Sequence, residues 1–315
     1  MFSSTTLWVN GDSLDILRSL PDESVDLFVT SPPYLRKVSY LPADHPDKGL
    51  ELGIEERPAD FIENLLTHAD EWWRVLRSTG SIAIDLGDTF SGSGGAGGDH
   101  NPGGLKEEQR KYAGTAAAKR KHPEAWPGDK GLCMIPEAFR LGLAYGMNPM
   151  RREANHERWL VRNVVTLCQQ SPKPGRQGDK FWPATTDMVV ACKSGTRTWN
   201  EDIPNPSLGG KGDYPKDFWV YKNRGTKGHP AGWNPDIVAP IILAMTPPGA
   251  VVLDPFAGSC TTVRCAADHG RIGIGLELNP EFNNLAADVC GMFLQNLSAE
   301  ELALGLKARN EAFGL

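Results

Sequence analysis

The sequence predicts an α/β fold in which helices cover both faces of a mostly parallel sheet. Three observations lead to this class. Short apolar runs typical of strands alternate with longer segments whose apolar residues recur at helical spacing. One strand-like run leads directly into a glycine-containing turn and the start of a helix. Hydrophobic residues make up 40% of the 315-residue chain, which is enough for a substantial core.

The chain begins with a strand, a short helix and a second strand. The apolar run "LWV" precedes a turn at Gly11-Asp12. "SLDILRSL" then has leucine and isoleucine at helical spacing until Pro21 ends the helix. "VDLFVT" (25–30) predicts the next strand, which stops abruptly at Ser31, two prolines and Tyr34.

A long amphipathic helix and a third strand follow. Residues 57–80 predict a helix that ends near Gly80 and covers the sheet. Its apolar stripe consists of Phe61, Leu65, Leu66, Ala69, Trp72, Trp73 and Leu76. "SIAIDLGD" (81–88) then predicts a buried strand.

The middle of the chain contains less regular sequence. Glycine dominates residues 87–104, so no regular structure is expected there, and a basic run follows at 106–122. "IPEAFRLGLAYGM" predicts a helix, and "WLVRNVVTLCQQ" and "DMVVACKSG" predict two more strands. Residues 196–235 show no clear periodicity and are expected to form an irregular insertion.

The C-terminal part returns to regular structure. From residue 236 onward the pattern predicts helix, strand, glycine loop, helix, strand and helix. The tail after residue 297 starts with a capping box, Ser298 with Glu301, and predicts a terminal helix.

Charge is distributed unevenly along the chain. The net charge is −6, but residues 101–230 hold 22 Lys+Arg against 13 Asp+Glu, which gives +9. The remainder holds 11 against 26, which gives −15. A basic middle between acidic flanks is compatible with a polyanionic partner, but an unevenly charged, solvated surface explains the same counts.

Other classes are disfavoured by composition. No apolar run reaches the roughly 18 residues that span a bilayer, and the first residues lack the pattern of a secretion signal, so a cytoplasmic protein with no membrane partner is expected. The six cysteines form no C-x-x-C pair and no cluster with histidine. They predict reduced thiols, with neither a disulfide framework nor a metal site.

The stretch "VVLDPFAGSCTT" (251–262) predicts a ligand-binding loop. Small residues after a strand let a ligand approach the backbone, and the helix start offers free N–H groups. Glu277 lies at the end of the next strand, 23 positions after Asp254, where an acidic residue accepts hydrogen bonds from a ribose. The loop matches neither G-x-G-x-x-G nor G-x-x-x-x-G-K-[ST], which favours an adenosine-bearing ligand without a pyrophosphate.

Two motifs together resemble a known family. "DPFAGSCTT" resembles the motif with which S-adenosylmethionine-dependent DNA methyltransferases hold their cofactor, and "TSPPY" (30–34) resembles the catalytic motif of enzymes that methylate exocyclic amines. The catalytic motif comes first, as in the permuted (β-type) group of DNA amino-methyltransferases. The similarity covers most of the chain except the glycine-rich loop, residues 105–130 and about 196–225.

The resemblance implies a Rossmann-like, seven-stranded methyltransferase sheet. Cofactor and target base would meet at the carboxyl ends of its strands. The implied S-adenosyl-L-methionine site consists of Asp12, Ser13, Asp254, Phe256, Gly258, Ser259, Thr261, Glu277 and Asn279. The stretch from His229 to Pro235 would cover the methionine end. Cys260 departs from the family pattern, which has glycine there, so the local backbone angle is an open question.

The implied catalytic residues are Ser31, Pro32, Pro33, Tyr34 and Asp85. The Ser31 hydroxyl and the Pro32 carbonyl would accept the hydrogens of the attacking amine, and the paired prolines make the turn rigid. Tyr34 would stack on a base flipped out of the duplex. Asp85 matches a position where N4-cytosine enzymes place a carboxylate, as proton acceptor or hydrogen-bond partner; a surface carboxylate at a strand end is the simpler alternative.

Serine in S-P-P-Y is typical of N4-cytosine enzymes, whereas D-P-P-Y is typical of N6-adenine enzymes. We therefore expect a site-specific DNA (cytosine-N4) methyltransferase acting by direct attack, with N6-adenine methylation as the alternative. Methylation at cytosine carbon 5 needs a Pro-Cys nucleophile, which Cys168 after leucine does not provide. RNA methylation and an inactive DNA-binding homologue are more distant alternatives.

The expected partner is double-stranded DNA, with contacts from Lys119, Arg120, Arg151, Arg152, Arg197, Lys222 and Arg224. The expected organisation is a catalytic domain of residues 1–195 and 229–315, a flexible insertion at 87–130, and a target-recognition region at 196–228. The resemblance also suggests association with the nucleoid and a cognate restriction endonuclease. The recognised site, and whether the protein is a monomer or homodimer, stay open.

Overall fold

The computed structural model describes residues 2–91, 123–170, 181, 183–203, 216–222, 233–291 and 294–314. The strands are β1 (Thr6–Asn10), β2 (Val25–Thr30), β3 (Leu76–Leu86), β4 (Leu160–Gln169), β5 (Thr185–Cys192), β6 (Phe218–Tyr221), β7 (Val251–Asp254), β8 (Ile272–Glu277) and β9 (Leu294–Asn296). The α-helices are α1 (Ser13–Ser19), α2 (Pro58–Val75), α4 (Ile135–Tyr145), α5 (Pro235–Met245), α6 (Thr261–Asp268), α7 (Phe282–Cys290) and α8 (Ala299–Phe313). Two short 3₁₀ helices are η1 (Pro46–Leu50) and η2 (Pro123–Ala125).

The described strands form one mixed sheet in the order β6-β4-β5-β3-β2-β7-β8-β1-β9. Strand β5 runs antiparallel to both of its neighbours, and the other pairings are parallel. The predicted α/β class is confirmed, and the seven central strands match the predicted number. Two short edge strands, β6 and β9, extend the sheet to nine in the described part of the chain.

The sheet brings the two ends of the chain together. Strand β2, from the N-terminal part, pairs in parallel with β7, from the C-terminal part, through Leu27 with Val252 and Phe28 with Leu253. Because both strands end at the same edge, the S-P-P-Y turn after β2 lies beside the glycine loop after β7. The fold thus brings together two segments, the S-P-P-Y turn and the glycine loop, that are more than 200 residues apart in the sequence.

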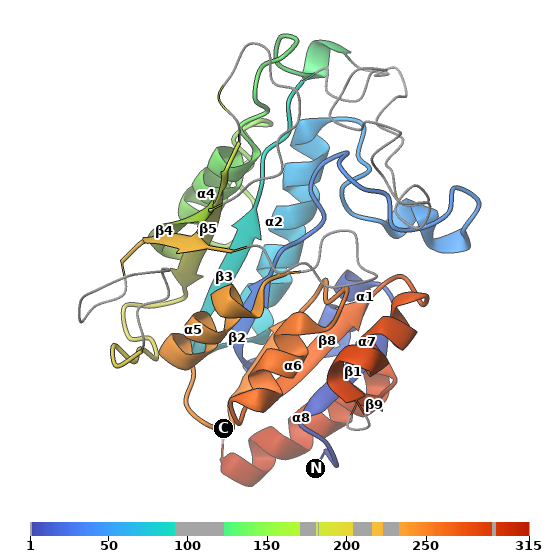
Figure 1. Ribbon diagram of the computed structural model, residues 1–315, viewed down its shortest axis with the longest axis vertical. Helices are drawn as coiled ribbons and strands as arrows, with labels where there is room; N and C mark the ends of the chain where they lie inside the picture. The colour runs from blue at the N-terminus through green and yellow to red at the C-terminus, as the bar shows by residue number, and fades with distance from the viewer. Residues whose placement is uncertain are drawn as a thin grey trace.

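Helices cover both faces of the sheet, as expected. Helices α1, α2, α4 and α8 pack on one face, where α1 contacts α2 and α8, and α2 contacts α4. Helices α5, α6 and α7 cover the other face; Figure 1 shows α5 and α6 side by side in front of the central strands. None of the helices that the structure describes is long and apolar enough to cross a membrane.

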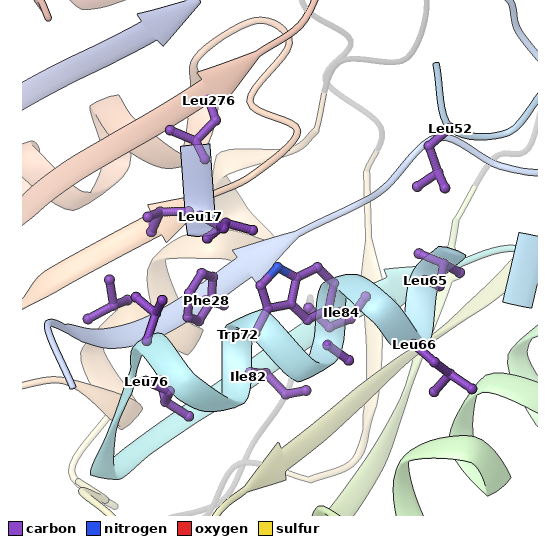
Figure 2. Close-up of a cluster of buried hydrophobic side chains, with 14 of the residues drawn as sticks. Leu17, Phe28, Leu52, Leu65, Leu66, Trp72, Leu76, Ile82, Ile84 and Leu276 are labelled. Atoms are coloured by element: carbon purple, nitrogen blue, oxygen red, sulfur yellow. The ribbon is translucent and has the colours of Figure 1, made fainter. Parts of the chain in front are cut away.

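Helix α2 anchors the first face through its predicted apolar stripe. Trp72 is fully buried, and its ring stacks on Phe28 of β2 with centroids 6.0 Å apart. Figure 2 shows Trp72 between Phe28 and Ile84, so the helix packs across two neighbouring strands. Burying side chains of this size contributes about 2–3 kcal/mol each, which fixes β2 and β3 relative to α2.

Two features differ from the sequence prediction. Helix α2 ends at Val75 rather than near Gly80, because Leu76 is already extended and pairs with Val25. Gly80 permits the close return of the chain, since a Cβ there would lie 2.6 Å from the Leu76 side chain. Strand β6 lies inside the segment that was expected to be irregular. The terminal helix α8 has the predicted capping box of Ser298 and Glu301.

Candidate active site

A cavity of about 440 Å³ lies at the carboxyl ends of the central strands. It is lined by the segments that follow β1, β2, β7 and β8, together with the end of β3 and the start of α5. This is the edge of an α/β sheet where ligands bind, because the loops after adjacent parallel strands diverge there. Its size lies within the range of small-molecule sites.

The glycine loop is held by the carboxylate that precedes it. Asp254 ends β7, and its Oδ1 accepts a hydrogen bond from the Phe256 backbone N–H at 3.1 Å. Its Oδ2 accepts one from the Thr262 hydroxyl at 2.7 Å, which ties the loop to the first turn of α6. Burial raises the pKa of Asp254 to about 6, so this carboxylate lies in a dry environment that favours a cationic or hydrogen-bonding ligand.

Left-handed backbone conformations at two positions shape this loop. Gly258 has φ 47°, and Cys260, which precedes α6, has φ 65°. This conformation strains residues with a Cβ, so glycine would suit position 260 better than cysteine does. The Cys260 side chain is fully buried and its Sγ contacts Sγ of Cys290 at 2.9 Å. The thiol therefore fills space between the loop and α7.

Glu277, at the end of β8, faces the same loop. Its Oε2 accepts the Gly258 backbone N–H at 2.9 Å, and its Oε1 accepts the Asn279 backbone N–H at 2.8 Å. Burial, with a smaller contribution from the negative charge of Asp254, raises the pKa of Glu277 to about 7. Asn279 in turn donates from Nδ2 to the carbonyl of Tyr40 at 2.8 Å, which closes this side of the cavity.

The segment after β1 contributes Asp12 and Ser13. Asp12 caps helix α1 by accepting the Asp15 backbone N–H at 2.9 Å. The Ser13 hydroxyl lies 3.1 Å from Nε2 of His68 on helix α2, and Nδ1 of that ring lies 2.7 Å from the carbonyl of Asn64. Because the Asn64 carbonyl only accepts, Nδ1 carries the proton, and Ser13 donates to Nε2. Burial lowers the pKa of His68, so the ring is neutral.

The S-P-P-Y turn and β3 form a hydrogen-bonded chain on the other side of the cavity. The Ser31 hydroxyl donates to the Tyr34 hydroxyl at 3.4 Å, and the Tyr34 hydroxyl donates to Oδ2 of Asp85 at 3.4 Å. Asp85 is buried, and an acceptor buried without a partner is costly. The Thr186 side chain, which also lines the cavity, acts on this carboxylate as a hydrogen-bond donor, so a ligand N–H group would share it with Thr186.

The ionisation of this chain follows from its burial. Burial, and secondarily the charge of Asp85, raises the pKa of Tyr34 well above its ordinary value, so the phenol stays protonated. Burial raises the pKa of Asp85 to about 6, so at neutral pH it is a carboxylate that is more basic than an ordinary aspartate. The chain can therefore take up one proton at its Asp85 end.

The structure brings most of the sequence-predicted residues together. The nine residues predicted to bind the cofactor and the five predicted to be catalytic all line this one cavity. Their individual roles stay predictions, but their convergence from five separate segments satisfies the first requirement of the predicted site. Of the stretch from His229 to Pro235, Trp233 and Asn234 line the cavity, and residues 229–232 lie outside the described part.

The residues predicted to bind DNA do not lie together in one place. Lys119, Arg120 and Arg224 lie outside the described residues. Lys222 is exposed and directly follows Tyr221, which lines the cavity. Arg197 precedes Thr198, whose backbone N–H donates to Thr79 near the start of β3, at the opposite end of the sheet from the cavity.

Arg151 and Arg152, which follow α4, differ in their surroundings. Arg151 forms ion pairs with Asp60 at 2.7 Å and Glu63 at 3.6 Å on helix α2, so it ties its turn to that helix. Arg152 is exposed. A phosphate contact for either residue stays a prediction, and for Arg151 it would compete with these two carboxylates.

Sequence reasoning missed several residues of the cavity: Lys37, Tyr40, His68, Thr186 and Tyr221. His68 lies on the buried side of an amphipathic helix, where a histidine gives no signal of its own. Lys37 had one usable signal, because it follows the catalytic motif by three residues. No cluster of metal-ligating side chains occurs in the described ranges, and the expected lack of a metal site stays a prediction.

Comparisons with known proteins agree with the resemblance carried by the two motifs. Residues 25–288 match the model of the N6/N4 DNA methylase family. The type II methyltransferase M.XycI of Xanthomonas campestris pv. cyanopsidis is 29% identical over 282 residues, which cover 88% of this chain and 85% of that protein.

Two solved structures share the fold. The PvuII DNA methyltransferase, which is cytosine-N4-specific, has a TM-score of 0.62 at 18% identity and covers 97% of this chain and 93% of its own. A Thermus thermophilus protein provisionally assigned as a DNA modification methylase, solved with S-adenosyl-L-methionine, has a TM-score of 0.56 at 20% identity. It covers 93% of this chain and 99% of its own.

The family match spans both motifs and the strands that carry them, including β2 with its S-P-P-Y turn and β7 with its glycine loop. The chain therefore belongs to the N6/N4 DNA methylase family and is a DNA methyltransferase that uses S-adenosylmethionine.

Proposed function

We propose that the protein transfers a methyl group from S-adenosylmethionine to the exocyclic N4 amine of a cytosine that is flipped out of double-stranded DNA. The observation that carries this proposal is the chain Ser31–Tyr34–Asp85, which lies in one cavity with the glycine loop and Glu277. An amine acceptor and an adenosine site within one cavity are what direct transfer requires.

The residues present fit the cofactor. Glu277 supplies the carboxylate that suits ribose hydroxyls, and Asp254 supplies negative potential near the loop. Phe256 and Phe282 give the cavity apolar walls suited to an adenine ring, with the Phe256 ring fixed against His68 at 5.4 Å between centroids. When bound, the cofactor supplies an electrophilic methyl group on a sulfonium.

The protein's own residues would prepare the amine and remove its proton. The lone pair of a cytosine amine is delocalised into the ring, and acceptors aimed at its hydrogens favour the tetrahedral nitrogen that attacks. Ser31 is placed to accept one such hydrogen. As the N–C bond forms, the bond between the methyl group and sulfur would break and leave a neutral thioether. An amine proton would pass to Ser31, the Ser31 proton to Tyr34, and the Tyr34 proton to Asp85. Asp85 ends as a carboxylic acid, and no covalent enzyme intermediate is needed.

The choice of cytosine rests on Ser31. Serine as the first residue of the motif is the N4-cytosine form, and the PvuII enzyme that shares the fold is cytosine-N4-specific. The family also includes N6-adenine enzymes, so adenine is the alternative base. The S-P-P-Y motif and the carboxylate at Asp85 are the two features on which the cytosine proposal depends.

Mass spectrometry of nucleosides tests this function. Unmethylated DNA of varied sequence is treated with the protein and S-adenosylmethionine, then digested. We expect N4-methylcytosine, and Asp85→Asn should reduce its yield strongly. N6-methyladenine in its place would retain the mechanism and refute the base, whereas 5-methylcytosine would refute direct transfer to an amine.

We further propose that Lys222 lies at the entrance used by DNA, since it follows cavity residue Tyr221 and Asn234 donates to its carbonyl. The arrangement of two catalytic segments with a recognition region between them stays part of this proposal. A restriction endonuclease partner is also a proposal; the type II relatives support it. Association of the protein with cytoplasmic DNA follows from its substrate in the same way.

A further inference from the structure

The side chain of Lys37 lies over the ring that is expected to bind the target base. Its Nζ lies 5.2 Å from the centroid of the Tyr34 ring, and both residues line the cavity. A cation over the face of an aromatic ring is attracted by the ring quadrupole. One face of Tyr34 therefore carries a positive charge within the cavity.

The Tyr34 ring has little freedom to present another surface. Gly87, directly after β3, packs against it so closely that a Cβ at position 87 would lie 2.5 Å from Cε2 of the ring. Its hydroxyl is held by Ser31 and Asp85. A base that stacks on the face where Lys37 lies would need the space that the ammonium fills, because aromatic rings stack with centroids about 4.5–7 Å apart and the Lys37 Nζ lies 5.2 Å from the ring centroid.

We propose that Lys37 occupies the base-stacking face of Tyr34 and moves to a phosphate of the flipped nucleotide when the base enters. This rests on the proposed function. A flipped nucleotide carries its own phosphates to the mouth of the cavity, and the flexible four-carbon stem of lysine lets its charge follow them. Cation and base would thus exchange places on one ring.

The exchange would also change the environment of Asp85. Five residues interact with this carboxylate through hydrogen bonds or charge: Tyr34, Thr186, Tyr221, Asp187 and Lys37. Burial raises its pKa, as does the charge of Asp187, whereas the charge of Lys37 lowers it. Once Lys37 leaves, that opposing effect is lost and Asp85 becomes a stronger proton acceptor. Entry of the base would activate the group that later takes its proton.

The first arm of the test measures DNA binding by Lys37→Met, which keeps the stem and removes the charge. The probe is a duplex that contains the site located by sequencing DNA methylated by the wild type. We expect about tenfold weaker binding, a slope of log Kd against log salt reduced by about one, and unchanged affinity for S-adenosylmethionine. Lys37→Arg should restore most of the binding. Lys307→Met, on the exposed side of α8, is the matched loss of charge and should behave as the wild type.

An unchanged salt slope in Lys37→Met, or an equal loss in Lys307→Met, would overturn the phosphate contact. A wild type that yields no methylated nucleoside would instead overturn the proposed function, and this proposal with it. The two failures are therefore distinguishable.

The second arm separates the free enzyme from the complex by pH. The profile of kcat/KM reports groups of the free enzyme, and that of the single-turnover rate at saturating DNA reports the complex. Lys37→Met should shift only the first profile, to higher pH. Equal shifts in both would show that Lys37 stays beside Asp85 after the base has entered, and would refute the displacement.

Discussion

Glu277 accepts a hydrogen bond from the Gly258 backbone N–H at 2.9 Å, so the carboxylate at the end of β8 holds the glycine loop that follows β7. Its other oxygen holds the Asn279 backbone N–H at 2.8 Å. The carboxylate expected to bind a ribose therefore also fixes the loop that surrounds the rest of the cofactor. Binding and loop geometry depend on one buried side chain.

Replacing Glu277 should therefore weaken cofactor binding more than the loss of one ribose contact would. Glu277→Ala leaves two buried N–H groups without acceptors, each worth about 1–3 kcal/mol, so we expect at least a hundredfold loss of affinity. Glu277→Gln retains one acceptor oxygen and should lose about tenfold. Calorimetric titration with S-adenosylmethionine measures both. Wild-type affinity in the alanine variant would contradict the role assigned to this residue.

The same residue predicts how stability changes with pH. The pKa of Glu277 is about 7 in the folded protein and has an ordinary value of 4.5, so the folded state binds more protons between these limits. The contribution of this group to the free energy of unfolding is therefore lost as pH rises from about 4.5 to 7. Glu277→Gln removes the titration and leaves Asp85 and Asp254 in place. Its thermal midpoint relative to the wild type should rise from pH 5 to pH 8 in the absence of cofactor; a constant difference would count against this assignment.

Gly87 should be required for turnover although it carries no reacting group. A methyl group at this position meets the Tyr34 ring at 2.5 Å, which displaces the ring from Ser31 and Asp85. Gly87→Ala should lower the single-turnover rate about a hundredfold and leave cofactor affinity unchanged, because a misplacement of about 1 Å costs that much.

Gly49→Ala is the matched control, because a Cβ there has open space around it. It should retain the wild-type rate. If Gly87→Ala is equally active, the Tyr34 ring does not need its present position for catalysis.

The two halves of the site were predicted from sequence because each is a contiguous motif. Asp254 to Thr261 and Ser31 to Tyr34 are short, chemically distinctive stretches, and the parallel sheet then places their strand ends together. Strand patterns with clear apolar runs, such as β2 and β7, were predicted for the same reason. Residue chemistry and the spacing of apolar residues were sufficient for prediction where both indicated the same element.

The rest depends on contacts between distant segments. His68 reaches Ser13 and Phe256 only because α2 packs across β2, and the amphipathic pattern of the helix does not distinguish it from an ordinary core residue. Strand β6 has four residues and pairs with β4 at an edge, which leaves almost no periodic signal. The end of α2 was missed because Leu76 continues the apolar stripe while its backbone is already extended.

Cys260 provides a test of backbone strain in the cofactor loop. Its φ of 65° costs about 1–2 kcal/mol for a residue with a Cβ, and its buried thiol regains part of this by packing on Cys290. Cys260→Gly should therefore change the unfolding free energy by less than about 1 kcal/mol and preserve cofactor affinity. Cys260→Val places a branched side chain in the same conformation and should destabilise by about 2 kcal/mol or more. Urea unfolding of both variants measures the difference; equal stability of the two would show that position 260 is unstrained.

The proton path predicts the pH dependence of the reaction itself. The pKa of Asp85 is about 6, raised chiefly by burial, and only the carboxylate can accept a proton through Tyr34. The value of kcat/KM, which reports the free enzyme, should be constant above about pH 7 and fall tenfold per unit below about pH 6, because each unit reduces the carboxylate fraction tenfold. Asp85→Asn cannot accept the proton, so its rate should be lower by about 10²–10⁴ and independent of pH in this range.

Asp88→Asn is the matched control, since Asp88 lies three residues further on and binds the backbone N–H groups of Met134 and Ile135. It should retain the acid limb of the wild type. A wild-type acid limb in Asp85→Asn would place the proton acceptor elsewhere in the cavity.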